Sequence, residues 1–191
     1  MPRRSPPSGG SLLAMTRIYM KQYITKVKKN EKKTIVIDKS GEYVVELVGE
    51  GAEANIVGVV MGKGDEKFTI RTLQLHKAPN TTSDLLIKSV LRDQSQIDYK
   101  GVIKIVKGAQ KSNAYQRNEN LLLSEKTHVE SKPELEIEAD DVRCTHGATM
   151  GMIDEKQMFY LMSRGLNKKQ SEDFIVEGFV KDVTDRMRVF N

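Results

Sequence analysis

Short β-type runs recur between turn signals through most of this 191-residue chain, and no long helical pattern separates them. The runs are rich in Val, Ile, Leu, Tyr and Thr, a composition typical of strands. Many short strands without helices restrict the fold to a β-sandwich, a β-barrel or a β-solenoid. The runs lie at residues 34–38, 43–48, 56–61, 68–76, 83–91, 96–106, 112–123 and 134–138.

The turns between these runs favour the solenoid. Asn-Gly and Asp-Gly, the strongest hairpin signals, do not occur in the sequence, which argues against simple meanders. Near-regular spacing with Asn, Ser and Thr at the turns is typical of coils that stack and bury a shared apolar interior. Within residues 49–55, Gly49 and Gly51 resemble part of a dinucleotide-binding pattern. A β run follows where that motif needs a helix, so we interpret the segment as a glycine turn.

A stretch at residues 133–151 separates the β-type region from two helical patterns. Residues 154–157 form a capping-box pattern, in which Asp154 would accept a hydrogen bond from the N3 amide and Gln157 would reach back. Gly165 then supplies a stop signal, and residues 167–170 repeat the start signal. The expected apolar faces consist of Met158, Phe159, Leu161 and Met162 in the first helix and Phe174, Ile175, Phe179, Val180 and Val183 in the second. These faces must cover the β region or a partner protein.

The net positive charge of the chain comes from its first 33 residues. The first 33 residues hold nine Lys or Arg and one Glu, whereas the rest holds 22 basic and 25 acidic residues. A nucleic-acid-binding face would spread over the fold, so none is expected. We predict a disordered segment at residues 1–16, a β-helix core at residues 17–151 and a helical unit at residues 152–191. Residues 17–33 are interpreted as a solvated strand with a lysine-rich turn, the alternative being a basic arm.

No apolar run reaches the roughly 18–20 residues that a membrane-spanning helix needs, and no secretory signal is recognisable. The single cysteine cannot form an internal disulfide and fits a reducing compartment, so a cytoplasmic protein without a membrane partner is expected.

Cys144 and His146 are the residues most suited to chemistry. One residue separates them, so on a strand both would point to the same face. Thiolate and imidazole suit iron, zinc or copper, but a closed zinc site needs four ligands, and the other histidines are His76 and His128. A site shared with a second chain is one hypothesis. The alternative is a structural cysteine, because free cysteine is common in protein cores.

The sequence motifs that would indicate a hydrolase are weaker than the Cys144 and His146 pair. The chain has no G-x-S-x-G elbow. The acidic pairs Glu136/Glu138 and Asp140/Asp141 are expected to face solvent, although β-helix lyases and hydrolases use such carboxylates. A self-contained β-helix domain, acting as a carbohydrate-active enzyme or a plain protein-interaction module, is therefore the alternative function.

Five segments resemble the SufB/SufD family, scaffold components of the Suf iron–sulfur cluster assembly machine. They are GEGAEANIVGV at 49–59, LHKAPNTTSDLLIKSVL at 75–91, YKGVIKIVKGAQKSNAYQRNENLLL at 99–123, PELEIEADDVRCTHGATMG at 133–151 and QMFYLMSRGL at 157–166. The resemblance covers about residues 34–182. It implies a mostly β fold, a right-handed parallel β-helix with a small C-terminal helical unit, and a scaffold rather than an enzyme.

The resemblance also implies partners. In the family the helical unit docks the SufC ATPase, and we expect Phe159, Phe174 and Phe179 to take part. The β-helix ends of two subunits meet in a dimer, so a SufB-like subunit or a second copy is expected at that end. The resemblance places Cys144 and His146 near this interface, as candidate ligands of iron or of a transient iron–sulfur cluster shared between subunits.

Within the family the chain resembles the D branch. The B branch carries a glutamate directly after the matching histidine, and this chain has Gly147 there. The upstream scaffold cysteine of the B branch has no counterpart, because Cys144 is the single cysteine. Family members usually carry an N-terminal region before the β-helix, and the resemblance indicates that this chain lacks it.

Overall fold

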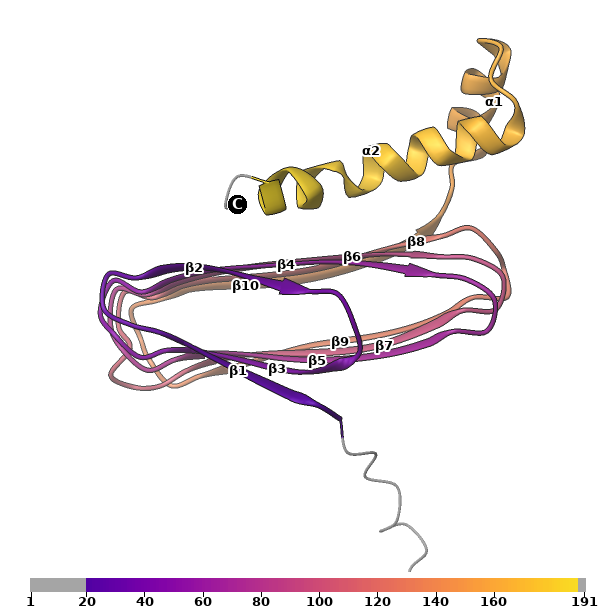
Figure 1. Ribbon diagram of the computed structural model, residues 1–191. Helices are drawn as coiled ribbons and strands as arrows, with labels where there is room; N and C mark the ends of the chain where they lie inside the picture. The colour runs from indigo at the N-terminus through magenta and orange to yellow at the C-terminus, as the bar shows by residue number, and fades with distance from the viewer. Residues whose placement is uncertain (1–19, 189–191) are drawn as a thin grey trace, which may run out of the picture.

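Ten strands and two helices make up the computed structural model, which describes residues 20–188 (Figure 1). The strands form two five-stranded sheets with the orders β1-β3-β5-β7-β9 and β2-β4-β6-β8-β10. Odd-numbered strands are β1 (Gln22–Val27), β3 (Gly41–Leu47), β5 (Lys67–His76), β7 (Gln96–Ile105) and β9 (His128–Ile137). Even-numbered strands are β2 (Lys32–Ile37), β4 (Glu53–Gly62), β6 (Thr82–Leu91), β8 (Asn113–Leu122) and β10 (Arg143–Met152).

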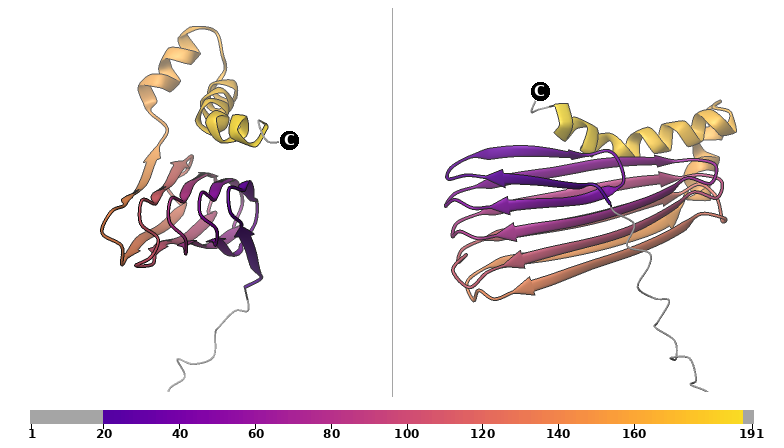
Figure 2. Two further views of the ribbon diagram at one scale, coloured as in Figure 1. Left: turned by 90° about the vertical axis from the view of Figure 1, so that its left-hand side faces the viewer. Right: turned by 60° about the horizontal axis from the view of Figure 1, so that its bottom comes forward.

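The two sheets are the two walls of a flattened solenoid (Figures 1 and 2). The chain crosses from one sheet to the other at every turn, and each strand pairs in parallel with the strand two positions later. Two strands and their turns thus make one coil. The prediction of a mostly β, parallel β-helix followed by a small helical unit is confirmed.

Alternate side chains of every strand point into the solenoid. The early coils have an apolar interior that includes Val27, Leu47, Ile56 and Leu85. This burial removes apolar surface from water and holds neighbouring coils together. Alternation within the predicted run 68–76 places Ile70, Thr72, Gln74 and His76 on one face of β5, and all four are buried in the interior.

The interior becomes polar toward the last coils. Gln74 Nε2 donates to Gln116 Oε1 at 3.2 Å, and Asn120 Nδ2 donates to Asn118 Oδ1 at 2.9 Å. Ser131 Oγ also donates to Asn118 Oδ1, at 2.8 Å. These hydrogen bonds pair most of the buried amide groups, although Gln74 Oε1 has no hydrogen-bond partner among the described residues.

Some strand bounds differ from the sequence prediction, and one strand was not predicted. The glycine turn is shorter than residues 49–55, because β4 begins at Glu53, and Gly51 takes a φ of +70° there. Strand β10 was not among the predicted runs. Its sequence contains two glycines and few branched residues, and the strand is held by its ladder to β8 rather than by its own propensity.

Two helices follow the solenoid, α1 (Glu155–Ser163) and α2 (Lys168–Arg188). Asp154 caps α1, but its Oδ1 accepts from the Lys156 N–H at 2.8 Å instead of the expected N3 amide. At α2 the expected reciprocal box is present, since Asn167 and Gln170 exchange two hydrogen bonds of 2.9 Å. Within residues 20–188 no helix has the length and apolarity needed to cross a membrane.

The lysine-rich beginning is partly neutralised by the next coil. Lys26, Lys29 and Lys32 lie 3.7, 3.8 and 2.7 Å from Glu46, Glu50 and Glu53, respectively. This pattern agrees with a solvated strand and turn. The predicted disordered segment at residues 1–16 lies outside the described residues.

Candidate functional site

Two features of the chain are candidates for function. The first is the last coil, formed by β9, β10 and the turn between them. The second is the helical hairpin, formed by α1 and α2, which follows β10 directly and places α2 along the outer face of the even-numbered sheet (Figure 2).

Cys144 and His146 both point toward the inner side of the last coil. In the ladder Cys144 lies beside Ala114, and His146 lies beside the buried Gln116. Within residues 20–188 β10 has one strand neighbour, β8, so no further coil covers these side chains. Cys144 is therefore half-buried and His146 is exposed. The spacing argument, that both side chains share one face of a strand, is confirmed.

Cys144 packs beside an apolar cluster that includes Ile103, Ile105 and Ala114. Burial raises the pKa of the Cys144 thiol, so the thiol is protonated at neutral pH. A metal ion would have to displace that proton, because the thiolate is the ligand.

No cluster of three or more His, Cys, Asp or Glu side chains with metal-site geometry occurs in the part of the chain that the structure describes. Cys144 and His146 are thus two candidate ligands at an edge that has no strand partner within residues 20–188. Further ligands from another molecule would be needed to hold an iron ion or cluster there.

The other two histidines lie apart from this pair. His76 is fully buried, with Nδ1 2.7 Å from Thr81 Oγ1 and Nε2 2.8 Å from Ser83 Oγ. Burial lowers its pKa to about 4, so the ring is neutral and serves as a structural hydrogen-bonding group. His128 begins β9 and is exposed.

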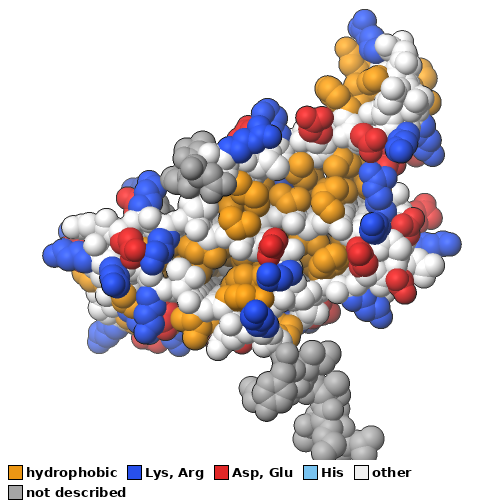
Figure 3. Space-filling model, in the orientation of Figure 1, with side chains coloured by type: hydrophobic (Ala, Val, Ile, Leu, Met, Phe, Trp, Pro, Cys, Tyr) orange, Lys and Arg blue, Asp and Glu red, His pale blue; other side chains and the backbone are white. Residues whose placement is uncertain are grey.

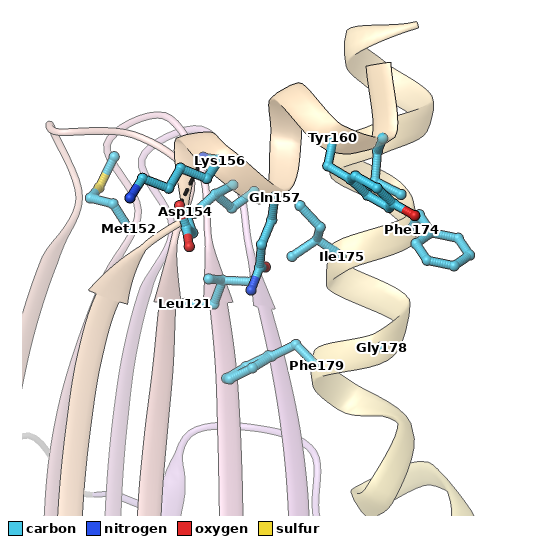
Figure 4. Close-up of a pocket in the computed structure, with 12 residues that line it drawn as sticks. Leu121, Met152, Asp154, Lys156, Gln157, Tyr160, Phe174, Ile175, Gly178 and Phe179 are labelled. Carbon is cyan, nitrogen blue, oxygen red and sulfur yellow. Dashed lines mark hydrogen bonds between the residues drawn. The ribbon is translucent and has the colours of Figure 1, made fainter. Parts of the chain in front are cut away.

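An apolar groove of about 760 Å³ lies between the helical hairpin and the ends of β8 and β10 (Figure 4). Phe179 and Ile175 project from α2 into it and face Leu121 of β8, while Gln157 reaches in from α1. Sequence periodicity identified Ile175 and Phe179 but not Leu121 or Gln157. Nothing in the sequence indicates which part of the solenoid lies under a helix.

Helix α2 is held on the outer face of the β4–β6–β8 side by charged and apolar contacts. Val183 is buried against Val57 and Leu86. Lys88 of β6 donates to the Phe179 carbonyl at 2.8 Å and lies 2.9 Å from Asp182. The ammonium group of Lys88 also lies 4.6 Å from the centre of the Phe179 ring.

The three phenylalanines predicted to dock a partner do not share one environment. Phe159 of α1 and Phe174 of α2 are 75% and 60% exposed. Phe179 is half-buried and packs beside Val90 and Leu121. The expectation that Phe174 lies on the same side of α2 as Phe179 was wrong, because α2 buries Val176 toward the sheet and turns Phe174 outward (Figure 4).

Residues 36–179 match the family described as "SUF system FeS cluster assembly, SufBD core domain". The chain is 36% identical over 143 residues to the iron–sulfur cluster assembly protein SufD of Escherichia coli, an alignment that covers 75% of this chain and 34% of that protein. It is 33% identical over 152 residues to SufD of Bacillus subtilis, covering 80% of this chain and 35% of that protein.

An iron–sulfur cluster assembly SufBD family protein of Mycobacterium tuberculosis is 33% identical over 141 residues, which cover 74% of this chain and 17% of that protein. The aligned part of the chain thus spans about a third of the length of the two SufD proteins and less of this longer relative.

Proposed function

The chain belongs to the SufBD core family of the SUF iron–sulfur cluster assembly system, and from this premise we propose that it is a non-enzymatic scaffold subunit of that system. In this proposal its last coil pairs with a SufB-like subunit, and its helical hairpin docks a SufC-like ATPase. The iron–sulfur cluster is cargo that assembles transiently at the paired edge. The observation that carries the proposal is the placement of Cys144 and His146 on the uncovered inner side of β10.

The open edge of the last coil supports the pairing. The outer edges of β9 and β10 have no strand partner within residues 20–188, and an unpaired edge is a template for another chain. A partner seated there would enclose Cys144 and His146 and contribute the remaining ligands. A site that is complete only in the complex suits a cluster that must later be released.

The exposed aromatic side chains of the helical hairpin support the docking. Phe159 and Phe174 are exposed together with Tyr160, and aromatic side chains are enriched where protein partners bind. Phe179 would act indirectly, since it holds α2 against Leu121 and Lys88. Closure of a docked ATPase would pull on α2, which is clamped to the solenoid and could transmit strain to the last coil.

Anaerobic reconstitution with iron and sulfide tests the role of Cys144 and His146. Wild type, Cys144→Ala and His146→Ala would each be mixed with SufB-like and SufC-like partners, and bound cluster would be measured by absorption spectroscopy. We expect cluster in the complete complex and a severalfold lower yield with either variant. Equal yields would show that both residues are structural. Glycan turnover unaffected by Cys144→Ala would favour the carbohydrate-active alternative.

A second experiment tests the docking surface. Phe159→Ser and Phe174→Ser are expected to leave the free energy of unfolding within about 0.5 kcal/mol of wild type, because both side chains are exposed. Both should weaken SufC binding, measured by calorimetry, by roughly tenfold or more. Met61→Ser, an exposed apolar residue on β4, is the matched control. Unchanged SufC binding in both variants would rule out this surface.

A further inference from the structure

Helix α1 lies between two apolar grooves. The larger groove, toward α2 and β8, is lined by residues 156, 157, 160 and 161 of α1, whereas residues 155, 158, 159 and 162 line a second groove of about 380 Å³. A helical period of about 3.6 residues places these two sets on opposite sides of α1. Three methionines line the second groove, called the methionine groove: Met152 at the end of β10, and Met158 and Met162 one helical turn apart on α1. Its apolar lining also includes Leu122, Leu123, Ile153 and Phe159.

The methionine groove is open to solvent. Met152 and Met162 are 50% and 46% exposed, and Met158 is half-buried. Helix α1 buries none of its residues, and hydrophobic side chains lie along it where it projects from the body of the molecule (Figure 3). Met187 of α2, in contrast, is half-buried and packs beside the buried Val183. Because oxidation of methionine follows its exposure, dissolved oxidants should reach Met152 and Met162 more readily than Met187.

Exposed methionine reacts with peroxides in a defined way. The thioether sulfur attacks one oxygen of hydrogen peroxide, so that the O–O bond breaks and an S–O bond forms. Sulfur gives two electrons to the peroxide, whose other oxygen leaves as water with both protons. The product, methionine sulfoxide, replaces a flexible apolar side chain by a polar one. Methionine sulfoxide reductases reverse the reaction: two thiols supply the electrons and become a disulfide, and the oxygen leaves as water.

The methionine groove adjoins the surface that we propose to dock the ATPase. Phe159 belongs to both, since it is exposed and also lines the groove between Met158 and Met162. An apolar partner side chain that enters the groove would contact thioethers, which adapt their shape to irregular partners. After oxidation the same side chain would cover polar sulfoxide oxygens that water solvates in the free chain. Desolvation of these oxygens would oppose binding.

We propose that Met152, Met158 and Met162 form a reversible oxidation site that controls the docking surface of α1. The reduced thioethers bind apolar side chains of a SufC-like ATPase, and the sulfoxides weaken that binding. This inference rests on the proposed docking of the ATPase and adds the chemical signal, a peroxide, that regulates it. A docked ATPase would in turn shield the three thioethers from peroxide.

Peptide mapping of the full chain tests whether peroxide reaches the groove. The chain would be treated with hydrogen peroxide without partners, and a thiol reductant would then return Cys144 to the thiol without reducing sulfoxides. Mass spectrometry would measure sulfoxide at each methionine. We expect Met152 and Met162 to oxidise severalfold faster than Met187, at a rate similar to that of Met61, which is exposed on β4. Oxidation of Met152 and Met162 as slow as that of Met187 would overturn the proposal.

Calorimetry with an untreated SufC-like ATPase measures the effect on docking. We expect the oxidised chain to bind at least about tenfold more weakly than the untreated chain. Methionine sulfoxide reductases of both stereospecificities should restore the affinity, because oxidation forms two sulfoxide epimers. Unchanged affinity after oxidation of the groove would refute the switch alone. An untreated chain that does not bind the ATPase would refute the proposed docking itself, and the switch with it.

Two variants assign the effect to the groove. Met152→Gln/Met158→Gln/Met162→Gln places polar groups there permanently, so we expect it to bind the ATPase as weakly as the oxidised wild type. Peroxide should change the affinity of this variant by less than about twofold. The matched control, Met61→Gln, should bind like wild type and lose affinity after peroxide treatment, and circular dichroism would verify that both variants keep the wild-type fold. Wild-type affinity in the triple variant would overturn the proposal.

Discussion

At the scale of single residues, His76 shows how a polar side chain can belong to a solenoid core. Its two ring nitrogens contact Thr81 and Ser83, and Thr81 Oγ1 lies 2.8 Å from Ser112 Oγ. Protonation would make both ring nitrogens donors and would place a charge where no water reaches. The ring therefore stays neutral, with a pKa lowered by burial to about 4.

This lowered pKa predicts an acid-dependent loss of stability. An unfolded histidine binds a proton near pH 6.5, whereas folded His76 does so near pH 4. Its contribution is thus fully present above pH 6.5 and decreases as the pH falls toward 4, by about 3 kcal/mol in all. Urea unfolding at a series of pH values measures this slope.

Two variants identify the source of that slope. His76→Gln should flatten the pH dependence between pH 6.5 and 5, whereas His128→Gln, which alters an exposed histidine, should leave it unchanged. The same slope in wild type and His76→Gln would contradict the prediction.

The sequence predicted which residues share one face of a strand but not what they contact. Alternation placed His76 and Gln74 on one face, and the C-x-H spacing placed Cys144 and His146 together. The partners Thr81, Ser83 and Gln116 lie in other strands or turns, and their contacts depend on coil register. The pairing register between coils is set by the whole ladder, so it cannot be predicted from one strand's sequence alone.

At the scale of elements, Lys88 is one of several side chains that hold α2 on the solenoid. Lys88 is 7% exposed and reaches Asp182, Glu119 and the Phe179 carbonyl. Lys88→Met would keep the aliphatic stem but remove the ammonium group from these partners. We expect a loss of about 2 kcal/mol, less than for a fully buried pair because Asp182 is 48% exposed.

Hydrogen exchange locates the effect of Lys88→Met. Amides of α2 should exchange faster than in wild type, while those of β5 and β7 should keep their protection. Lys181→Met removes an exposed lysine on α2 whose i,i+4 partner is Asp185, and it should change stability by less than about 0.5 kcal/mol. Unaltered exchange of α2 in Lys88→Met would show that the apolar contacts and the ion pairs of Arg92 and Arg186 hold the helix without Lys88.

Elements with strong local signals were predicted, and elements that depend on neighbours were not. The box at Asn167 and Gln170 fixed the start of α2, and runs rich in branched residues identified the central strands. Strand β10 was missed because Gly147 and Gly151 weaken its local signal. The outward position of Phe174 was missed because helical periodicity does not say which stripe faces the sheet.

At the scale of the whole molecule, the solenoid is a stack in which each coil contacts its neighbours. Stability is then close to a sum of coil and interface contributions, so opening should begin at the ends. The end coils differ in how well they are held. The first coil buries Val27 and Ile37 and has lysine–glutamate pairs to the next coil, whereas most of β9 and β10 is exposed.

This difference predicts a gradient of protection along the chain. Amides of β5 to β8 should exchange only through global unfolding, because coils flank them on both sides. Amides of β10 should exchange fastest among the strands, because within residues 20–188 one of its edges is unpaired, as in β1, β2 and β9, and eight of its ten residues are exposed. Hydrogen exchange followed by mass spectrometry measures this order, and β10 amides as slow as those of β6 would contradict it. A SufB-like partner seated on the last coil should slow the exchange of β10 amides, because the partner would then pair the open edge of β10.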